Sequence, residues 1–399
     1  MSTVSGLSTT YNTPNYHGDL FAITPADTPL LSSIGGISGG KQTSSTAFEW
    51  QTDDLRDPDI RARLEGADAP TAEERARANV ENVLQIFQEA ITTSYTKQAA
   101  IGQYTSPSSA PYITADGSPN PVVDEHSHQI AQALKQVARD VNYCFWHGVK
   151  VKPSSNSTAR ATGGLLRVLT TNRTANNEIT AASASTDTIT VTHALENGDK
   201  IVFTDVGAST AIRPDRAYYV VNKSTTVSFK VAATSGGAAI TVGTATVAFV
   251  KASTALTVAA LETFMQGIFD NGGISEMDTA TLFASSRQKR AITAAYADEY
   301  GKTDLFAGNR NLGGVSVQTL QTNFGVLNVV VDRALPPDAI VVASAEQLAP
   351  VFLNIPDKGV LFEEELATTG SAKKSQIYGE IGLQYGNQLA HGQLRGLLV

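Results

Sequence analysis

The sequence predicts an α+β protein into which an all-β domain is inserted. Helical and strand-like patterns follow one another without the βαβ spacing of a parallel-sheet protein. One amphipathic helix is predicted from about Asp124 to His147, with an apolar stripe along most of its length. A cluster of short β-branched runs occupies residues 177–254, and helical patterns lie on both sides of it. These three observations define the fold class.

The first 40 residues predict an extended arm. They contain no lysine or arginine and are rich in Ser, Thr, Gly and Pro. Their apolar residues follow no helical or strand period, so the segment cannot bury a face by folding alone. The absence of positive charge excludes a basic arm that neutralises nucleic acid. The candidate anchors of this arm are Tyr11, Leu20, Phe21, Leu30 and Leu31.

A long hairpin with a charged tip is predicted next. A strand-like run at 47–52 leads into residues 53–77, where eight acidic residues and five arginines stand among 25 positions. Proline and glycine interrupt this stretch, which is typical of a loop or hairpin tip. The predicted return strand covers 83–95, with Phe87, Ile91, Thr93 and Tyr95 on one face. An isolated hairpin is only marginally stable in water, so this one needs a neighbour.

The long helix and the inserted domain follow. The helix stripe comprises Ile130, Leu134, Val137, Val141, Cys144 and Phe145, and Gly148 ends the helix. Close spacing of short strands predicts a sandwich or barrel that forms a domain of its own. The candidate strands are Asp187–His193, Lys200–Thr204, Ala217–Asn222, Thr226–Ala232, Ala239–Val242 and Thr246–Lys251.

The remaining segments mix helices and strands. Thr257 is expected to cap a helix to Asp270, and a second helix is expected at 286–300. The inward side chains of the first helix are predicted to be Leu261, Phe264, Met265, Ile268 and Phe269. Strands are expected at 325–331 and 339–342, and a capping box at Ser344–Gln347 is expected to open a short helix. The final strand is expected to alternate through Ile377, Ile381, Leu383 and Tyr385.

Composition excludes several classes of protein. Charged residues make up 17% of the chain, against a typical value of about 25%, which favours extensive burial against partners. The net charge of −8 gives no global attraction to a polyanion. The single cysteine excludes an intramolecular disulfide and fits a reducing cytosol. Neither a signal peptide nor an apolar run of membrane-spanning length is expected.

Three patterns come close to known chemistry. Gly35–Lys41 matches a phosphate-binding loop up to its last position, where Gln42 replaces the required Ser or Thr, so we interpret it as a flexible linker. Cys144 and His147 lie three residues apart, but the cysteine continues the apolar stripe and is expected in the core. Glu125, His126 and His128 form no helical face, so a solvated helix start is favoured over a metal site. No catalytic residue, cofactor or metal is predicted.

Several ordered strings resemble one family. They are Pro29–Gly35, Phe48–Leu55, Ala62–Ala69, Gly267–Gly273, Gln288–Arg290 and Tyr378–Asn387. They resemble the major head proteins grouped with that of phage SU-ten, which are tailed-bacteriophage major capsid proteins of the HK-ninety-seven fold. The resemblance covers about 1–176 and 255–399.

The resemblance implies the following division of the chain. Residues 1–45 would be the N-terminal arm, 46–98 the E-loop, 99–176 and 351–399 the peripheral domain with its spine helix at 124–147, and 255–350 the axial domain. Residues 177–254 would be an inserted domain that lies on the outer surface. The implied function is self-assembly into hexamers and pentamers of an icosahedral virion shell around double-stranded DNA, in the host bacterial cytoplasm.

The resemblance also implies partners. A portal is expected, and decoration proteins are a further candidate. Because the sequence begins directly with the arm, a separate scaffold protein is implied, or none. Residues 42–96 contain no lysine, so the covalent lysine–asparagine link of the fold's type member has no candidate in the E-loop. Two alternatives stay open: an encapsulin-type compartment, and an enzyme that depends on nucleotide through Lys41 or on the Cys144 thiol.

The predicted subunit-interface residues lie in the E-loop. Carboxylates and arginines are concentrated there, and the arginine fork suits bidentate contacts with the carboxylates of a neighbouring subunit. The site residues are Trp50, Asp53, Asp54, Arg56, Arg61, Arg63 and Glu65.

Overall fold

The computed structural model describes residues 23–37, 39–56, 58–72, 75, 77–99, 125–224, 226–274, 280–300, 319–367 and 370–399. The chain divides into two compact units. The first comprises Met1–Asp27, Ile86–Asp140 and Ile355–Gly379, and the second comprises Thr28–Gln85, Val141–Asn354 and Glu380–Val399. The predicted arm anchors Tyr11, Leu20 and Phe21 lie outside the described residues.

The first unit contains helix and strand segments packed on a small core. Its elements are β4 (Gln85–Ser94), α2 (Tyr95–Ala99), the start of α3 (Glu125–His147), β17 (Leu361–Glu365) and the start of β18 (Ala372–Gln384). β17 and β18 are antiparallel, and β4 also pairs with β18. Ile91, Ala133 and Ile377 form the core, one from each of β4, α3 and β18.

The second unit contains the hairpin and the strands at its base. β2 (Ala47–Asp53) pairs antiparallel with β3 (Arg77–Val83) along its whole length. β1 (Lys41–Thr43) and β16 (Ala349–Leu353) pair in parallel, and β16 pairs with the end of β18. The short helices α1 (Pro29–Ser33) and α4 (Leu165–Val168) belong to the same unit.

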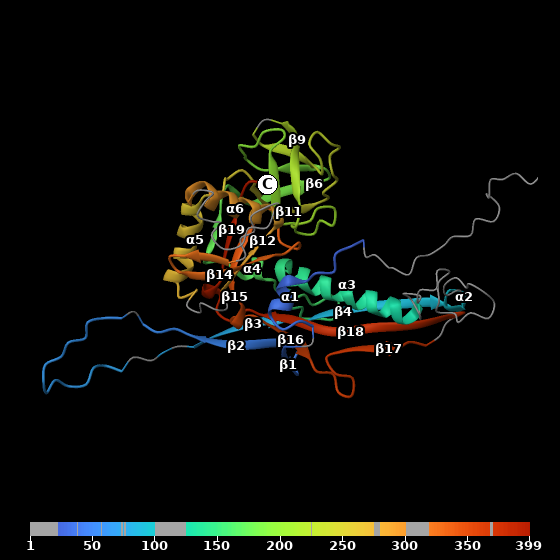
Figure 1. Cartoon of the computed structure of the whole chain (residues 1–399), viewed down its shortest axis with the longest axis horizontal. Coiled ribbons are helices and arrows are strands. Elements are labelled where there is room, and N and C mark those ends of the chain that lie inside the picture. The colour runs from blue at the N-terminus through green and yellow to red at the C-terminus, as the bar shows by residue number, and fades with distance from the viewer. Residues whose placement is uncertain are drawn as a thin grey trace, which may run out of the picture. The chain divides into compact units, whose positions relative to one another are not determined.

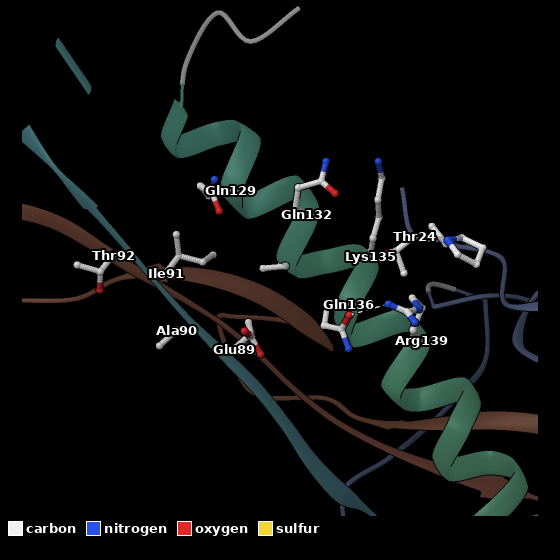
Figure 2. Close-up of a pocket in the computed structure, with 13 residues that line it drawn as sticks. Thr24, Glu89, Ala90, Ile91, Thr92, Gln129, Gln132, Lys135, Gln136 and Arg139 are labelled. Carbon is white, nitrogen blue, oxygen red and sulfur yellow. Dashed lines mark hydrogen bonds between the residues drawn. The ribbon is translucent and has the colours of Figure 1, made fainter. Parts of the chain in front are cut away.

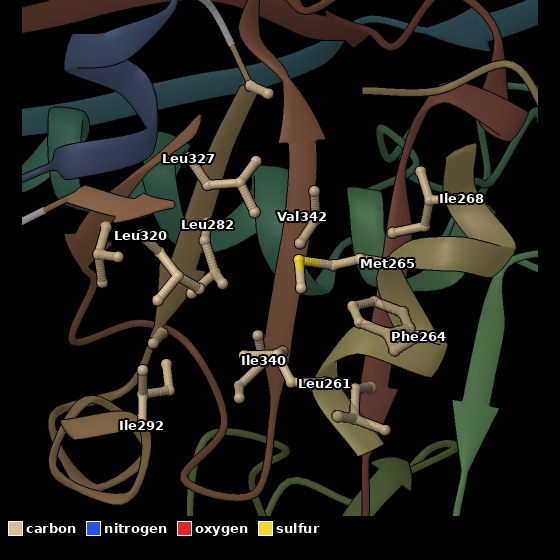
Figure 3. Packing of buried hydrophobic residues seen from close by; sticks show 14 of the residues in the cluster. Leu261, Phe264, Met265, Ile268, Leu282, Ile292, Leu320, Leu327, Ile340 and Val342 are labelled. Carbon is tan, nitrogen blue, oxygen red and sulfur yellow. The ribbon is translucent and has the colours of Figure 1, made fainter. Parts of the chain in front are cut away.

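A six-stranded sheet carries the main core of the second unit. Its order is β13 (Thr319–Thr322), β14 (Gly325–Val331), β12 (Ala280–Ala284), β15 (Ile340–Ser344), β19 (Gly392–Arg395) and β5 (Arg173–Ala175). Helices α5 (Val258–Asp270) and α6 (Ser286–Tyr300) pack on it. Figure 3 shows Phe264 and Met265 of α5 beside Val342 and Ile340 of β15. Two 3-10 turns, η2 (Ala345–Gln347) and η3 (Gln388–Ala390), complete this part.

The inserted strands form a closed barrel. The order around it is β10 (Ser228–Ala232), β7 (Thr188–Thr190), β6 (Glu178–Ser185), β11 (Ala245–Lys251), β8 (Lys200–Asp205) and β9 (Ala217–Ser224). Phe203, Phe229 and Phe249 are fully buried inside it, with edge-on ring contacts. Figure 1 shows the barrel at the strands labelled β6, β9 and β11. Between the alternatives of sandwich and barrel, the structure therefore has the barrel.

Several predicted elements are confirmed. α3 begins one residue after the predicted start and ends at His147 as expected. The end of α3 crosses a neighbouring segment so closely that a Cβ at Gly148 would lie 2.3 Å from the Thr162 carbonyl oxygen. α5 has the predicted bounds, and the Thr257 hydroxyl accepts a hydrogen bond from the Ala260 amide. The predicted helix at 286–300 and strand at 325–331 are also present.

Other predictions are wrong for identifiable reasons. The predicted strand over 83–95 is confirmed as β4, with Phe87, Ile91 and Thr93 buried on one face. It is not the partner of β2, however. β2 pairs with 77–83, because the strand breaks at the buried Leu84 and the alternation restarts in β4. Tyr95 is exposed because it begins α2. In α3 the side chain of Leu134 is 39% exposed, because the buried face is centred on Ala133 and Val137.

Four further features differ from expectation. Phe269 is 47% exposed and contacts the ring of Phe324 instead of the core. Ala239–Val242 is not a strand, although Ile240 still donates a backbone bond to Val231. Ser344 makes no side-chain cap, and the residues after it form only the 3-10 turn η2. β6 was not predicted, because its alternating alanines and serines carry little apolar signal.

Candidate interaction surfaces

The hairpin tip, residues 54–76, has no core of its own. Every described residue from 53 to 79 is exposed to solvent. Among them are three large apolar side chains: Leu55 is 79% exposed, Ile60 94% and Leu64 86%. In Figure 1 this segment extends beyond β2 and β3 as a loop. These three exposed apolar side chains make the hairpin tip a candidate interaction surface.

The structure brings most of the predicted site residues together. Asp54, Arg56, Arg61, Arg63 and Glu65 lie on the hairpin tip, and Asp53 lies at its border on β2; all six are exposed. Arg63 donates to the carbonyl of Asp68 at 3.1 Å, a local bond that shapes the loop. Sequence reasoning missed Leu55, Ile60 and Leu64, although apolar residues spaced through a charged run were a visible signal.

Trp50 lies on β2 at the base of the hairpin, within the strand-like run that the sequence predicted. Its indole Nε1 donates to the carbonyl of Gly386 at 2.8 Å, and its ring meets Tyr385 edge-on at 4.8 Å. It also packs against Phe48, which is buried in a cluster with Leu84. These contacts are within one chain, so Trp50 holds the hairpin to its own subunit. A subunit contact by Trp50 stays a prediction.

The return strand of the hairpin is fixed by polar contacts. Asn82 is fully buried; its amide donates to the carbonyls of Gly163 and Leu383 at 3.1 and 2.7 Å. Glu81 bonds Lys152 and Lys150 at 2.6 and 2.9 Å, and these ammonium groups lower the pKa of its carboxyl. The tip therefore projects from a firmly held base.

The arm is anchored where it enters the second unit. Leu30 and Leu31 of α1 are buried, as the sequence predicted. Beside them the buried carboxylate of Asp332 accepts hydrogen bonds from the Trp146 indole at 2.8 Å and the Asn142 amide at 3.2 Å. Asp332 also accepts from the Leu30 backbone amide, at 3.4 Å. One carboxylate thus joins α1, the end of α3 and the end of β14.

A groove lies between α3 and β4 in the first unit. Its volume is about 540 Å³, and Thr24–Ala26 form part of its wall. Figure 2 shows Gln132, Lys135, Gln136 and Arg139 of α3 along the groove, opposite Glu89–Thr92 of β4. Arg139 donates to the side chain of Gln136 at 3.0 Å. The wall of the groove is therefore made chiefly of polar side chains of α3 that face β4.

The patterns that approached known chemistry have structural roles. Lys41 begins β1 and pairs with Val351, so a strand stands where a phosphate-binding loop requires a helix. The Gln85 amide donates to the thiol of Cys144 at 3.5 Å. His147 donates from Nε2 to the carbonyl of Ala334 at 2.7 Å, and burial lowers its pKa to about 4. Each of the two side chains therefore has a structural partner of its own, Gln85 for Cys144 and Ala334 for His147.

The interpretation of the start of α3 as solvated is wrong for His126. This side chain is buried, with Nδ1 bonded to Thr93 Oγ1 at 3.1 Å and Nε2 to Ser375 Oγ at 2.9 Å. Both ring nitrogens thus contact protein groups. Glu125 pairs with Lys97 at 2.6 Å, which lowers the pKa of its carboxyl. Among the described residues, no three His, Cys, Asp or Glu side chains are grouped to hold a metal ion.

A comparison with protein families matches almost the whole chain. The model of the family described as SU10 major capsid protein covers residues 3–398. The chain belongs to this family. It is a major capsid protein of a bacteriophage virion, a component of an icosahedral shell.

Solved structures share the fold of this major capsid protein. The capsid asymmetric unit of cyanophage A-1(L) matches with a TM-score of 0.55 at 10% identity, over 96% of this chain and 97% of that chain. The capsid of a native GTA particle matches with a TM-score of 0.50 at 11% identity, over 100% and 99% of the two chains. The predicted HK-ninety-seven-like α+β fold is confirmed.

Two other comparisons add less. An encapsulin of Synechococcus elongatus matches with a TM-score of 0.44 at 9% identity, over 96% of this chain and 92% of that one, and does not favour the compartment alternative. No curated protein matches this major capsid protein. Each helix in the described ranges is too short or too polar to cross a membrane.

Proposed function

We propose that this major capsid protein assembles into hexamers and pentamers through its hairpin tips, and that the resulting shell encloses double-stranded DNA without reading its sequence. The observation that carries the proposal is the exposure of Leu55, Ile60 and Leu64 on a segment without a core. Burying three such side chains contributes about 4–8 kcal/mol per subunit. Charged neighbours on the tip, Arg56, Arg61 and Arg63 among them, give the contact its orientation.

The proposal also includes the division of the chain and the partners that the family resemblance implies. The arm is residues 1–45, the E-loop 46–98, the peripheral domain 99–176 with 351–399, the axial domain 255–350 and the insert 177–254. The shell forms in the host cytoplasm with a portal and a separate scaffold or decoration protein. It holds together by burial and ion pairs and carries out no catalysis.

The test compares two triple variants of the full chain. Leu55→Ser, Ile60→Ser and Leu64→Ser together should leave a folded subunit that forms few or no shells in electron micrographs. The control replaces Val149, Val227 and Leu398 by serine, three side chains 49–52% exposed and outside the hairpin tip. Normal shell yield from the tip variant, or equal loss in the control, would contradict the proposal.

Circular dichroism of both variants establishes that the subunits are folded. DNA extracted from wild-type particles separates a virion shell from a cargo compartment. Particles that contain a protein cargo and no genome would favour the encapsulin alternative.

A further inference from the structure

We infer that the barrel is a hinged module, held against the rest of its unit by a latch that salt weakens. The barrel here means residues 178–252, and the body means the six-stranded sheet with α4, α5, α6 and the end of α3. The inference concerns one subunit and does not depend on how subunits contact one another.

One end of the seam between barrel and body is a hinge. The chain crosses the seam twice, near residues 175–178 and 251–254, and backbone bonds tie the crossings together, including Lys251 N to Asn177 O at 3.2 Å. Thr254 donates to Gly396 and accepts from Leu398, so the C-terminal segment joins both crossings. A small apolar cluster surrounds them: Val202, Val250 and Ala252 with Ala175, Ala217 and Val399. Figure 1 shows the C-terminus beside the barrel.

The other end of the seam is ionic. β8 begins at the hinge, where the Lys200 ammonium donates to the carbonyl of Val399 at 2.6 Å. Five residues later, about 17 Å along the strand, the Asp205 carboxylate pairs with Arg167 of α4 at 2.9 Å. The guanidinium of Arg213 lies over the ring of Tyr143 of α3, 4.9 Å from its centre. These two contacts are the latch.

The middle of the seam is hollow and polar. A cavity of about 300 Å³ is lined by Thr204, Asp205 and Ala248 of the barrel and by Arg167, Thr170 and Arg395 of the body, among other residues. The Arg167–Asp205 pair therefore forms part of its wall. A polar cavity of this size holds water. The apolar cluster that the structure describes between the two surfaces lies around the hinge.

The latch is weak because its groups are partly hydrated. The side chains of Arg167 and Asp205 are 24% and 43% exposed. A half-exposed ion pair and a cation–π contact together shift an equilibrium by about five- to thirty-fold. Salt screens such charges. Raised ionic strength therefore lets the barrel pivot about its crossings while its aromatic core stays packed.

The ion pairs of the barrel support the distinction between a hinge and a latch. Its other carboxylates pair inside the barrel: Asp187 with Lys230, Glu196 with Lys223, Asp199 with Lys251 and Asp215 with Arg213. Glu178 pairs with Arg173 beside the hinge. Among the ion pairs of the described residues, the Asp205–Arg167 pair is the one that joins a barrel carboxylate to a body residue distant from the crossings.

Thiol labelling of the full chain tests the inference. A cysteine at Ala248, which is 7% exposed and lines the cavity, reports opening of the seam. A cysteine at Ala182, which is 2% exposed inside the barrel, reports unfolding of the barrel itself. Both are made with Cys144→Ser. We expect labelling of A248C to accelerate between 50 and 500 mM NaCl, and that of A182C to stay unchanged.

Latch variants complete the experiment. Arg167→Ala with Arg213→Ala should accelerate labelling of A248C about five- to thirty-fold at low salt and remove its salt dependence. Lys230→Ala, which breaks an ion pair inside the barrel, is the matched control. It should change neither the labelling rate of A248C nor the salt dependence of that rate. Equal acceleration of A182C would show that the barrel melts, and an unchanged A248C rate would show a rigid seam; either result overturns the inference.

Discussion

Replacing Asp332 should destabilise the second unit more than any surface change. The carboxylate is 1% exposed and accepts from the Trp146 indole, the Asn142 amide and the Ala334 amide. Asp332→Ala leaves the first two of these donors buried without an acceptor. Each such orphan costs about 1–3 kcal/mol, so we expect the free energy of unfolding to fall by about 2–6 kcal/mol.

Asp332→Asn should lower the free energy of unfolding by less than Asp332→Ala does. The amide retains one acceptor oxygen, while its NH₂ group faces the other donors. The assay is urea unfolding of the unassembled chain followed by tryptophan fluorescence, which Trp146 reports directly. The control is Glu196→Ala, which breaks a pair whose carboxylate is 74% exposed and should cost less than about 1 kcal/mol. If D332A and E196A were equally stable, the proposed role of this carboxylate in anchoring the arm would be refuted.

Three further predictions concern assembly, the barrel and pH. Replacing the tip arginines Arg56, Arg61 and Arg63 by alanine should leave a folded subunit that assembles poorly. Heads formed with wild-type yield and thermal stability would contradict a role of these arginines in subunit contacts. Deleting 177–254 with a short Gly/Ser bridge should still give closed particles with a smoother outline in electron micrographs. These particles should be less heat-stable, because Ala175 and Val399 lose their apolar cover. Loss of capsomers would contradict this prediction. Acid should destabilise the folded chain between pH 6.5 and 4, and His147→Gln, which keeps a donor for the Ala334 carbonyl, should weaken this dependence in unfolding curves.

The sign of the pH effect follows from burial. His147 and His391 have folded-state pKa values lowered to about 4, chiefly because burial disfavours the charged ring. Their unfolded value is 6.5, so below it the unfolded chain binds more protons than the folded one. Stability is complete above pH 6.5 and falls by up to about 3 kcal/mol per histidine as the pH approaches 4. An unchanged unfolding midpoint across this range would contradict the assignment of buried, neutral rings.

Local patterns predicted the long elements well. α3 and α5 were predictable because their apolar residues recur at helical spacing and Thr257 marks a start. The barrel was open to two interpretations, since strand spacing is similar in sandwiches and barrels and closure depends on which strands pair. The break at Leu84 was not predictable, because it depends on packing against Phe48 and Val351.

The candidate site was predicted in part. Charge density identified the hairpin tip, because a segment of this composition cannot bury itself. The contacts of Trp50 with Tyr385 and Gly386 were not predictable, since these partners are more than 300 residues away in sequence. The role of Asp332 was not predictable either, because it depends on contacts with Leu30, Asn142 and Trp146, which are distant from it in sequence.

Electron cryomicroscopy of particles formed by the purified chain tests the central claim most directly. We predict closed icosahedral shells in which Leu55, Ile60 and Leu64 of each hairpin tip are buried against a second copy of the chain. Shells in which these three side chains face solvent, or a chain that remains monomeric under all assembly conditions, would contradict the account.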